Sequence, residues 1–250
     1  MVKRREVLAL GLAALSARAL LPDPAFAQSA YPDRPIRFIV PFPPGGAFDT
    51  VARPWAEKIK PLLGTFVVEN VGGGGGSVGA AQAARARPDG YTILLGGATT
   101  HITEGLLKNR PQYDPLKDLE PISGIAITAF AIAVHPSVPV HSLKELIDYA
   151  KANPGKLSYG SAGTGSLNHL SAELFKLRTG LSDLVHVPYR GAGPALVDIL
   201  AGQIPMIVPA MTNHVLALHQ SGKLRVLAVD QCHAFDRRAR SADRGRAGTA

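Results

Sequence analysis

Two segments of the chain share one pattern: a β-like run, then a glycine-rich turn, then the start of a helix. The first covers residues 36–49 (IRFIVPFPPGGAFD) and the second covers residues 157–169 (LSYGSAGTGSLNH). The first backbone N–H groups of a helix have no acceptor inside it and lie at the positive end of its dipole, which favours an anion there. The pair therefore predicts a ligand held from two sides, with one carboxylate at each helix start.

Between residues 31 and 229, short β-branched runs alternate with helical stretches, which is typical of an α/β fold with mainly parallel sheets. We expect strands at residues 36–41, 65–69, 91–95, 122–134, 157–159, 184–187, 204–208 and 224–229. We expect helices at residues 48–63, 78–86, 143–152, 167–179, 194–201 and 212–221. The run at 122–134 is long for one strand and contains Gly124, so it could pass between two sheets and mark a hinge. The repeated turn design favours two lobes that face each other across a cleft, at residues 28–125 and 126–229.

The two ends of the chain differ from this body. Residues 1–27 combine a basic start, an apolar run and an Ala25-Phe26-Ala27 cleavage site, as expected of a signal peptide for export to the periplasm by the Sec or the twin-arginine route. The apolar run is too short to span a bilayer. Residues 230–250 are rich in arginine and alanine and have no apolar periodicity. We interpret them as a disordered basic tail or as out-of-frame sequence after a truncation.

Composition excludes several classes of protein. The leader and the tail carry part of the net charge of +8, so the body is only mildly basic. It suits small anionic ligands but lacks the clustered Lys and Arg and the interleaved aromatic residues of a nucleic-acid binder. Cys232 is the single cysteine, so the chain cannot form an internal disulfide or a cysteine metal site. His214 and His219 lie five residues apart, on different helix faces, so we predict no metal and no cofactor.

The glycine run at residues 72–76 formally produces two motifs. Gly74, Gly76 and Gly79 match a dinucleotide fingerprint, but no acidic residue closes a following strand to bind a ribose. We interpret the run as a flexible loop whose backbone approaches the ligand or the other lobe closely. Residues 75–79 also read G-x-S-x-G, so a secreted α/β serine hydrolase using Ser77 is the alternative function. The other members of its triad would come from this set: Asp114, Asp118, Asp183, His186 and His214.

Polar side chains in the two turns have two interpretations each. Asp49 is either a first-turn acid that complements the helix dipole or a hydrogen-bond acceptor for the ligand. Ser161, Thr164 and Ser166 are either turn residues or hydroxyl donors to a carboxylate. Phe42 belongs either to the core or to the wall of the cleft.

Further candidates lie at a helix start and at a strand end. His169 occupies the first turn of the second helix and could contact the ligand, whereas His186 alternates with valines in a strand and is typical of a structural histidine. Thr99 and Thr100 follow the end of a strand, where open α/β sheets bind ligands.

Ordered motifs along residues 31–229 resemble the periplasmic solute-binding proteins of tripartite tricarboxylate transporters, known as the Bug family. The motifs are residues 31–36 (YPDRPI), 41–49 (PFPPGGAFD), 68–70 (VEN) with the glycine run, 87–92 (RPDGYT), 113–119 (YDPLKDL) and 186–191 (HVPYRG). The resemblance implies a two-lobed type II periplasmic-binding-protein fold that closes on a small carboxylate without catalysis. It also implies a monomer that delivers its ligand to membrane transporter subunits.

The resemblance carries a set of ligand-binding residues onto this chain. They are Phe42, Gly45, Gly46, Ala47, Asp49, Ala98, Thr99, Thr100, Ser161, Ala162, Thr164, Gly165, Ser166 and His169. Two features depart from the family. Residues 203–209 read QIPMIVP where the family usually has QVDVMFD, so both acids near the cleft are lost. This loss suits a more anionic ligand or one that bears fewer amines, or else it alters closure. The family also continues past residue 229 to complete its first lobe, so we expect a truncated chain with an incomplete first lobe and exposed apolar surface.

Overall fold

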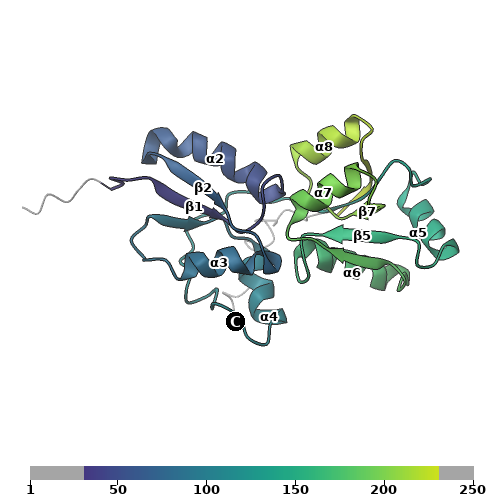
Figure 1. Cartoon of the computed structure of the whole chain (residues 1–250), viewed down its shortest axis with the longest axis horizontal. Coiled ribbons are helices and arrows are strands. Elements are labelled where there is room, and N and C mark those ends of the chain that lie inside the picture. The colour runs from purple at the N-terminus through teal and green to yellow at the C-terminus, as the bar shows by residue number, and fades with distance from the viewer. Residues whose placement is uncertain (1–30, 231–250) are drawn as a thin grey trace, which may run out of the picture. The chain divides into compact units, whose positions relative to one another are not determined.

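The computed structural model describes residues 31–230, so the predicted signal peptide and nearly all of the basic tail lie outside the described residues. The described residues from Arg34 onward belong to one compact unit. They contain two separate sheets, which we call sheet 1 and sheet 2 (Figure 1). The strands of sheet 1 all precede residue 125 and those of sheet 2 all follow it, while the lobe boundary itself stays a prediction.

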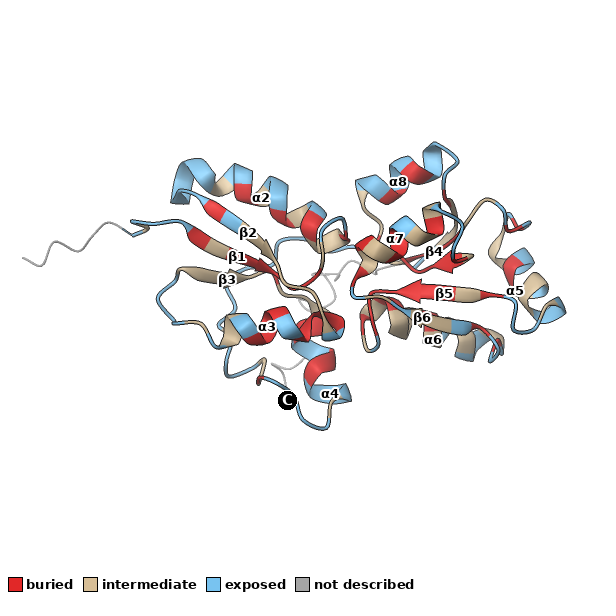
Figure 2. Cartoon of the chain, viewed as in Figure 1, coloured by how far each residue is buried: buried red, intermediate tan, exposed pale blue. Residues whose placement is uncertain are grey.

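Sheet 1 has three parallel strands in the order β2-β1-β3. The strands are β1 (Ile36–Val40), β2 (Phe66–Asn70) and β3 (Thr92–Leu94). Helix α2 (Ala47–Leu63) covers one face and α3 (Ser77–Ala84) covers the other (Figure 1). The central strand β1 is the most apolar of the three, and its buried side chains form the core between the helices (Figure 2).

Short helical segments follow two of these elements. A 3-10 turn, η1 (Gly74–Gly76), leads into α3, and a π-helical turn, η2 (Thr99–Thr103), continues into α4 (Glu104–Leu107). The sequence pattern predicted neither η2 nor α4, because the threonine-rich run has no apolar periodicity. Single π-helical turns are frequent at functional sites.

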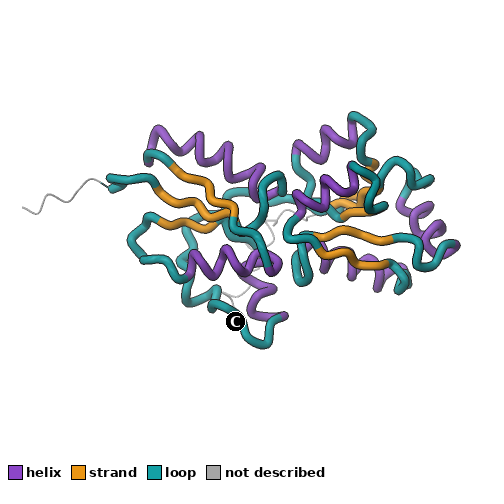
Figure 3. The backbone as a smooth tube through the Cα atoms, in the orientation of Figure 1, coloured by secondary structure: helices purple, strands orange, loops and turns teal. Residues whose placement is uncertain are grey.

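Sheet 2 has five strands in the order β6-β5-β7-β4-β8. The strands are β4 (Ala131–Val134), β5 (Ser158–Ser161), β6 (Val185–Pro188), β7 (Met206–Ile207) and β8 (Arg225–Val229). Strand β5 runs parallel to β6 and β7, whereas β4 runs antiparallel to β7 and β8. The strand and helix segments alternate along the chain around both sheets (Figure 3).

Four helices cover sheet 2. They are α5 (Leu143–Ala152), α6 (Leu167–Thr179), α7 (Ala192–Leu200) and α8 (Asn213–Gln220). Leu146 of α5 and Ala172 of α6 pack in one core cluster, and Ile199 of α7 and Val215 of α8 pack in another. These two clusters place a helical layer on each face of the sheet, as expected of a three-layer α/β architecture.

One expected strand is wrong over most of its length. Of residues 122–134, only Ala131–Val134 form a strand, because β8 supplies a partner only from the pair Ala131 and Val229 onward. Phe130 forms only an isolated bridge with Ala210, residues 122–129 belong to no strand, and Ile122 and Ile127 are each 77% exposed. These side chains fit the expectation of uncovered apolar surface. The other expected elements are confirmed, with ends that differ by no more than two residues.

Within residues 31–230, no helix combines the length and the apolar character needed to cross a membrane.

Candidate functional site

The first glycine turn joins β1 to α2. Gly46 is the N-cap of α2 and has no side-chain cap, and the first helical hydrogen bond runs from Thr50 N to Gly46 O at 3.0 Å. The N–H groups of Ala47 and Phe48 therefore have no acceptor inside the helix. Gly45 has a φ of +81°, a conformation that suits glycine. The turn thus presents backbone donors at a helix start, as the sequence predicts.

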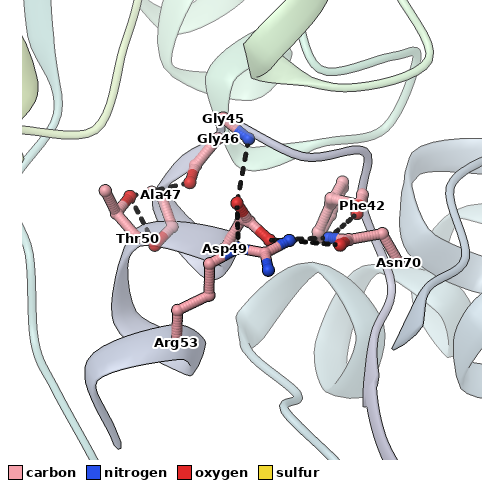
Figure 4. Close-up of polar contacts among 8 residues, drawn as sticks. All are labelled: Phe42, Gly45, Gly46, Ala47, Asp49, Thr50, Arg53 and Asn70. Atoms are coloured by element: carbon pink, nitrogen blue, oxygen red, sulfur yellow. Dashed lines mark hydrogen bonds and ion pairs between the residues drawn. The ribbon is translucent and has the colours of Figure 1, made fainter. Parts of the chain in front are cut away.

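The carboxylate of Asp49 turns back onto this turn (Figure 4). Its Oδ2 accepts hydrogen bonds from Gly45 N at 3.1 Å and Arg53 Nε at 3.0 Å, and its Oδ1 accepts one from Asn70 Nδ2 at 3.0 Å. Asn70 Nδ2 also donates to Phe42 O at 3.0 Å. Burial disfavours the charged carboxylate, but the hydrogen bonds from Arg53, Gly45 and Asn70 outweigh it, so the pKa of Asp49 lies below its usual value. Asp49 holds the shape of the turn, and its contact with a ligand stays a prediction.

The second glycine turn joins β5 to α6. Ser166 is the N-cap, and its Oγ accepts a hydrogen bond from His169 N at 3.3 Å. The hydroxyl of Ser161 accepts one from Gly163 N at 3.1 Å, and Ser166 N donates to Gly163 O at 3.1 Å. The first helical bond runs from Leu170 N to Ser166 O. A β-region N-cap serine that bonds the third helical N–H is a common helix start, which explains why the sequence predicted α6 correctly.

Three aromatic rings form a column beside the second turn. His169 stacks on His186 with a centroid distance of 4.2 Å, and His186 stacks on Tyr159 at 4.9 Å. His169 Nδ1 accepts a hydrogen bond from Gly165 N at 3.2 Å, and His186 Nε2 lies 2.6 Å from Ser161 Oγ. Burial lowers the pKa of both histidines, and the neighbouring His169 also contributes to lowering the pKa of His186 to about 4.

His186 lies beside the second turn, a position that the sequence pattern did not predict. Alternation with valines made it look structural, but the parallel pairing of β6 with β5 sets it opposite Tyr159 and beside Ser161. Cross-strand pairing cannot be read from the sequence of one strand. The motif that contains His186 was visible only through the family resemblance.

The helix α7 contributes backbone that the candidate set did not include. A methyl group at Gly193 would lie 2.2 Å from Pro44 O, so only glycine allows the start of α7 to lie against the first turn. Gly75 of the glycine run lies close to the second turn, where an added methyl would lie 3.2 Å from Thr164 O, while its approach to a ligand stays a prediction. Residues 184–200 have the same order as the two predicted turns: a β-like run, then glycines, then a helix. This repeated order could have indicated from the sequence that Gly193 lies near the site.

The π-helical turn η2 also reaches the second turn. Thr99 Oγ1 accepts a hydrogen bond from Leu167 N, the first residue of α6, at 3.4 Å. The hydroxyl of Thr100 exchanges hydrogen bonds with Gly97, and both threonines are buried. Phe42 is buried as well and lies against Phe48, with a centroid distance of 4.7 Å.

The candidate residues thus fall into three groups. Phe42, Gly45, Gly46, Ala47 and Asp49 lie at the first turn. Ser161, Ala162, Thr164, Gly165, Ser166 and His169 lie at the second turn. Ala98, Thr99 and Thr100 lie at the start of η2.

Ser77, the nucleophile of the alternative hydrolase, has partners unlike those of a catalytic triad. Its Oγ donates to Gly74 O at 2.9 Å and accepts a hydrogen bond from Lys108 Nζ at 2.6 Å. Lys108 also forms an ion pair with Glu104 at 2.8 Å. Ser77 is 1% exposed, and no histidine within residues 31–230 hydrogen-bonds to it.

The described residues contain no group of three or more His, Cys, Asp or Glu side chains that could hold a metal ion.

Comparison with known proteins identifies the family. Residues 51–243 match the family described as "Tripartite tricarboxylate transporter family receptor". The chain belongs to this family. It is 40% identical over 204 residues to the protein BugT of Bordetella pertussis. The aligned region covers 80% of this chain and 61% of BugT. The chain therefore spans less than two thirds of that relative's length.

Solved structures of family members have the same fold. The periplasmic binding protein BugD is 39% identical, with a TM-score of 0.74 over 80% of this chain and 66% of BugD. An R. palustris protein with adipate is 36% identical, with a TM-score of 0.75 over 80% of this chain and 66% of that protein. MatC from Rhodopseudomonas palustris with bound malate is 31% identical, with a TM-score of 0.73 over 80% of this chain and 67% of MatC. The α/β fold of periplasmic binding proteins, with mainly parallel sheets, is confirmed.

Proposed function

We propose that this chain is the solute-binding receptor of a tripartite tricarboxylate-type transporter, and that it captures a small carboxylate in the periplasm for the membrane subunits. The observation that carries the proposal is the pair of glycine turns, each of which opens a helix at an N-cap. Relatives of known structure hold adipate and malate, which supports a carboxylate as the ligand class. Export would follow from the leader at residues 1–27.

The donors of this site are backbone N–H groups. Ala47 and Phe48 supply them at α2, and Asn168 supplies one at α6. The Leu167 N–H, which donates to Thr99 Oγ1 at 3.4 Å, would have to leave that acceptor to join them. The acid of the first turn does not repel an anion strongly, because the Arg53 guanidinium lies 2.9 Å from the Asp49 carboxylate. A dicarboxylate can then place one end at each turn.

Binding would close the two lobes on the ligand. The division at residues 28–125 and 126–229 puts the first turn and η2 in one lobe and the second turn and α7 in the other. The contacts of Gly193 with Pro44 and of Gly75 with Thr164 are between residues of different lobes. Domain closure of this kind is a common signal for a membrane partner, and a monomer suffices for it.

The segment at residues 203–209 sets the charge preference of the site. Asn168, at the start of α6, donates from Nδ2 to Val208 O at 2.6 Å, so this segment lies next to the second turn. The segment carries no acidic residue and so offers no carboxylate to bind an amine on the ligand. We therefore favour a di- or tricarboxylate without an amino group.

The proposed site binds its ligand without bond-making chemistry. Ser77 is buried and hydrogen-bonded to Gly74 and Lys108, and the family consists of receptors. No second function is favoured by a specific contact.

A panel of acetate, succinate, adipate, malate and citrate tests the proposal in thermal-shift and calorimetric titrations. A ligand that binds only the folded state stabilises it according to its concentration relative to Kd. The sharpest variant is Ala47→Pro, because proline is tolerated at the first helical position yet has no N–H. The matched control is Asn213→Pro, at the first position of α8 and away from both turns.

The proposal expects binding of at least one di- or tricarboxylate, with affinity reduced about tenfold in Ala47→Pro by the loss of one charge-assisted hydrogen bond. Asn213→Pro should bind like the parent chain. Three outcomes would overturn the proposal: no carboxylate stabilises the protein, both proline variants lose affinity equally, or the protein hydrolyses esters in a Ser77-dependent way.

A further inference from the structure

The second turn contains two histidines that carboxylate binding by backbone donors does not require. His169 and His186 lie in stacking contact, and each is within hydrogen-bond distance of a group in the turn, Gly165 N and Ser161 Oγ respectively. Neither histidine forms an ion pair with an acid among the described residues. Histidine can gain or lose a proton near neutral pH, so two such rings beside an anion site could couple ligand binding to protonation.

The hydrogen bond from Gly165 fixes the protonation of His169. A backbone N–H can only donate, so the Nδ1 atom that faces it at 3.2 Å must present a lone pair. His169 is therefore neutral in this arrangement and carries its ring proton on Nε2. A positively charged His169 would have a proton on Nδ1 and could not keep this bond.

Burial is the main cause that lowers the pKa of His169, and Lys176 lowers it further, whereas Glu173 raises it. On its own helix, Glu173 is already paired with Lys176 at 2.9 Å and accepts a hydrogen bond from Tyr159 at 2.6 Å. On β6, the ring of His186 stacks on His169 at a centroid distance of 4.2 Å and covers one face of it. The start of α6 is itself electropositive.

From the sheet 1 side, the residues that reach this turn carry no charge. Thr99 accepts the hydrogen bond from Leu167, Leu107 approaches Gly165 and Gly75 approaches Thr164. Within residues 31–230, Glu173 is the acid that favours a protonated His169, and it is already paired with Lys176, so a bound anion would add a second negative charge.

We propose that a carboxylate bound at the second turn takes over the Gly165 N–H donor and that His169, released from it, takes up one proton from solvent at Nδ1. The protonated ring then donates to the carboxylate. The balance is one ligand and one proton bound per protein, with no covalent bond made or broken. This inference rests on the proposed function and adds that the site is proton-linked.

Linkage gives the sign of the pH effect. The bound complex holds one more proton than the free protein over the pH window between the two pKa values of His169. In that window, the association constant falls as pH rises, by up to about tenfold per pH unit. Below and above the window, the affinity is independent of His169. Burial places the pKa in the free protein below the ordinary histidine value, so the window includes mildly acidic pH.

Calorimetric titration with adipate at pH 6, in buffers of different ionisation enthalpy, measures the proton directly. The slope of the binding enthalpy against the buffer enthalpy equals the number of protons taken up. We expect a slope approaching +1 for the parent chain. We expect a slope near zero for His169→Gln, whose side chain can accept from Gly165 but cannot gain a proton. His214→Gln, an exposed histidine on α8, is the control and should keep the parent slope.

His186→Gln provides a readout that a merely structural role would not move. Removing the neighbouring ring exposes His169 to water and should raise its pKa, so the pH of greatest proton uptake should move upward. Adipate binding with a zero slope from pH 5 to 8, or an unchanged slope in His169→Gln, would overturn this inference and leave the proposed function standing. If no carboxylate binds at any pH, both fall together.

Discussion

In the first turn, charged side chains hold the backbone in place, whereas in the second turn, hydroxyls and neutral imidazoles do so. The first turn relies on Asp49 with Arg53, and the second relies on Ser161 with His186 and on His169. Carboxylate and guanidinium keep their charges throughout the neutral range, while imidazole does not. The same backbone design is thus pH-independent on one side and pH-dependent on the other.

The largest expected effect comes from breaking the charged network of the first turn. Asp49→Asn removes the ion pair with Arg53 at a side chain that is only 9% exposed. We expect the free energy of unfolding to fall by about 2–3 kcal/mol, less than for a fully buried pair because Arg53 is half exposed. Urea denaturation measures it.

The control for this variant is Asp148→Asn, which breaks an ion pair at the same four-residue spacing. Both partners, Lys144 and Asp148, are exposed, so the loss should stay below about 1 kcal/mol. Equal losses in the two variants would show that Asp49 does not hold the turn.

The next effect tests whether the first turn depends on its contact with α7. Gly193→Ala would place a methyl group 2.2 Å from Pro44 O, so the backbone must move apart. We expect a loss of about 2 kcal/mol in unfolding free energy and weaker adipate binding. Gly105→Ala is the matched helical control, because nothing lies within 4 Å of the added methyl, and it should leave stability unchanged or slightly higher. A neutral Gly193→Ala would mean that the two elements need not touch.

A smaller effect is the pH dependence of the unfolding free energy, which should arise at the second turn and not at the first. The pKa of His186 is about 4 in the folded chain and near 6.5 when unfolded, so the unfolded state binds more protons between these values. Stability should therefore fall as pH drops from 7 to 5, by about 1 kcal/mol after allowance for the partial exposure of His186. His186→Gln should lose this dependence, whereas Asp49→Asn should keep it. Urea denaturation at pH 7 and pH 5 measures this dependence. The comparison would be contradicted if His186→Gln kept the pH dependence of the unfolding free energy and Asp49→Asn lost it.

The smallest effect concerns the link from η2 to the second turn. Thr99→Val removes the acceptor of the Leu167 N–H, and a single hydrogen bond of 3.4 Å predicts a loss of about 0.5–1 kcal/mol. Because the N–H group becomes available to a ligand, adipate affinity should stay equal or increase. Thr179→Val, which removes a hydroxyl bond within α6, should leave affinity unchanged. A marked loss of affinity in Thr99→Val alone would place the threonine hydroxyl on the ligand instead.

The sequence predicted the parts of the fold that depend on local chemistry. Ser142 and Ser166 are N-caps that accept from the third helical N–H, and both α5 and α6 begin where these residues predict. Strand β1 follows directly from its apolar run. The expected strand over residues 122–129 failed because pairing depends on a distant partner, and the local run cannot report whether one is present.

The candidate site shows the same division. Glycines with positive φ, such as Gly45 and Gly165, mark the turns in the sequence itself. The contact of Asp49 with Asn70 could not be predicted, because it needs the register of β2 against β1. The position of His186 needed the register of β6 against β5.

The central claim is that backbone donors of both turns bind one carboxylate ligand at the same time. An ¹⁵N–¹H correlation spectrum recorded during an adipate titration tests it residue by residue. We expect the amide signals of Ala47 in the first turn and of Gly165 and Leu167 in the second to move together, with one shared half-saturation concentration. Adipate binding that shifts the amides of only one turn, or of neither, would contradict the account.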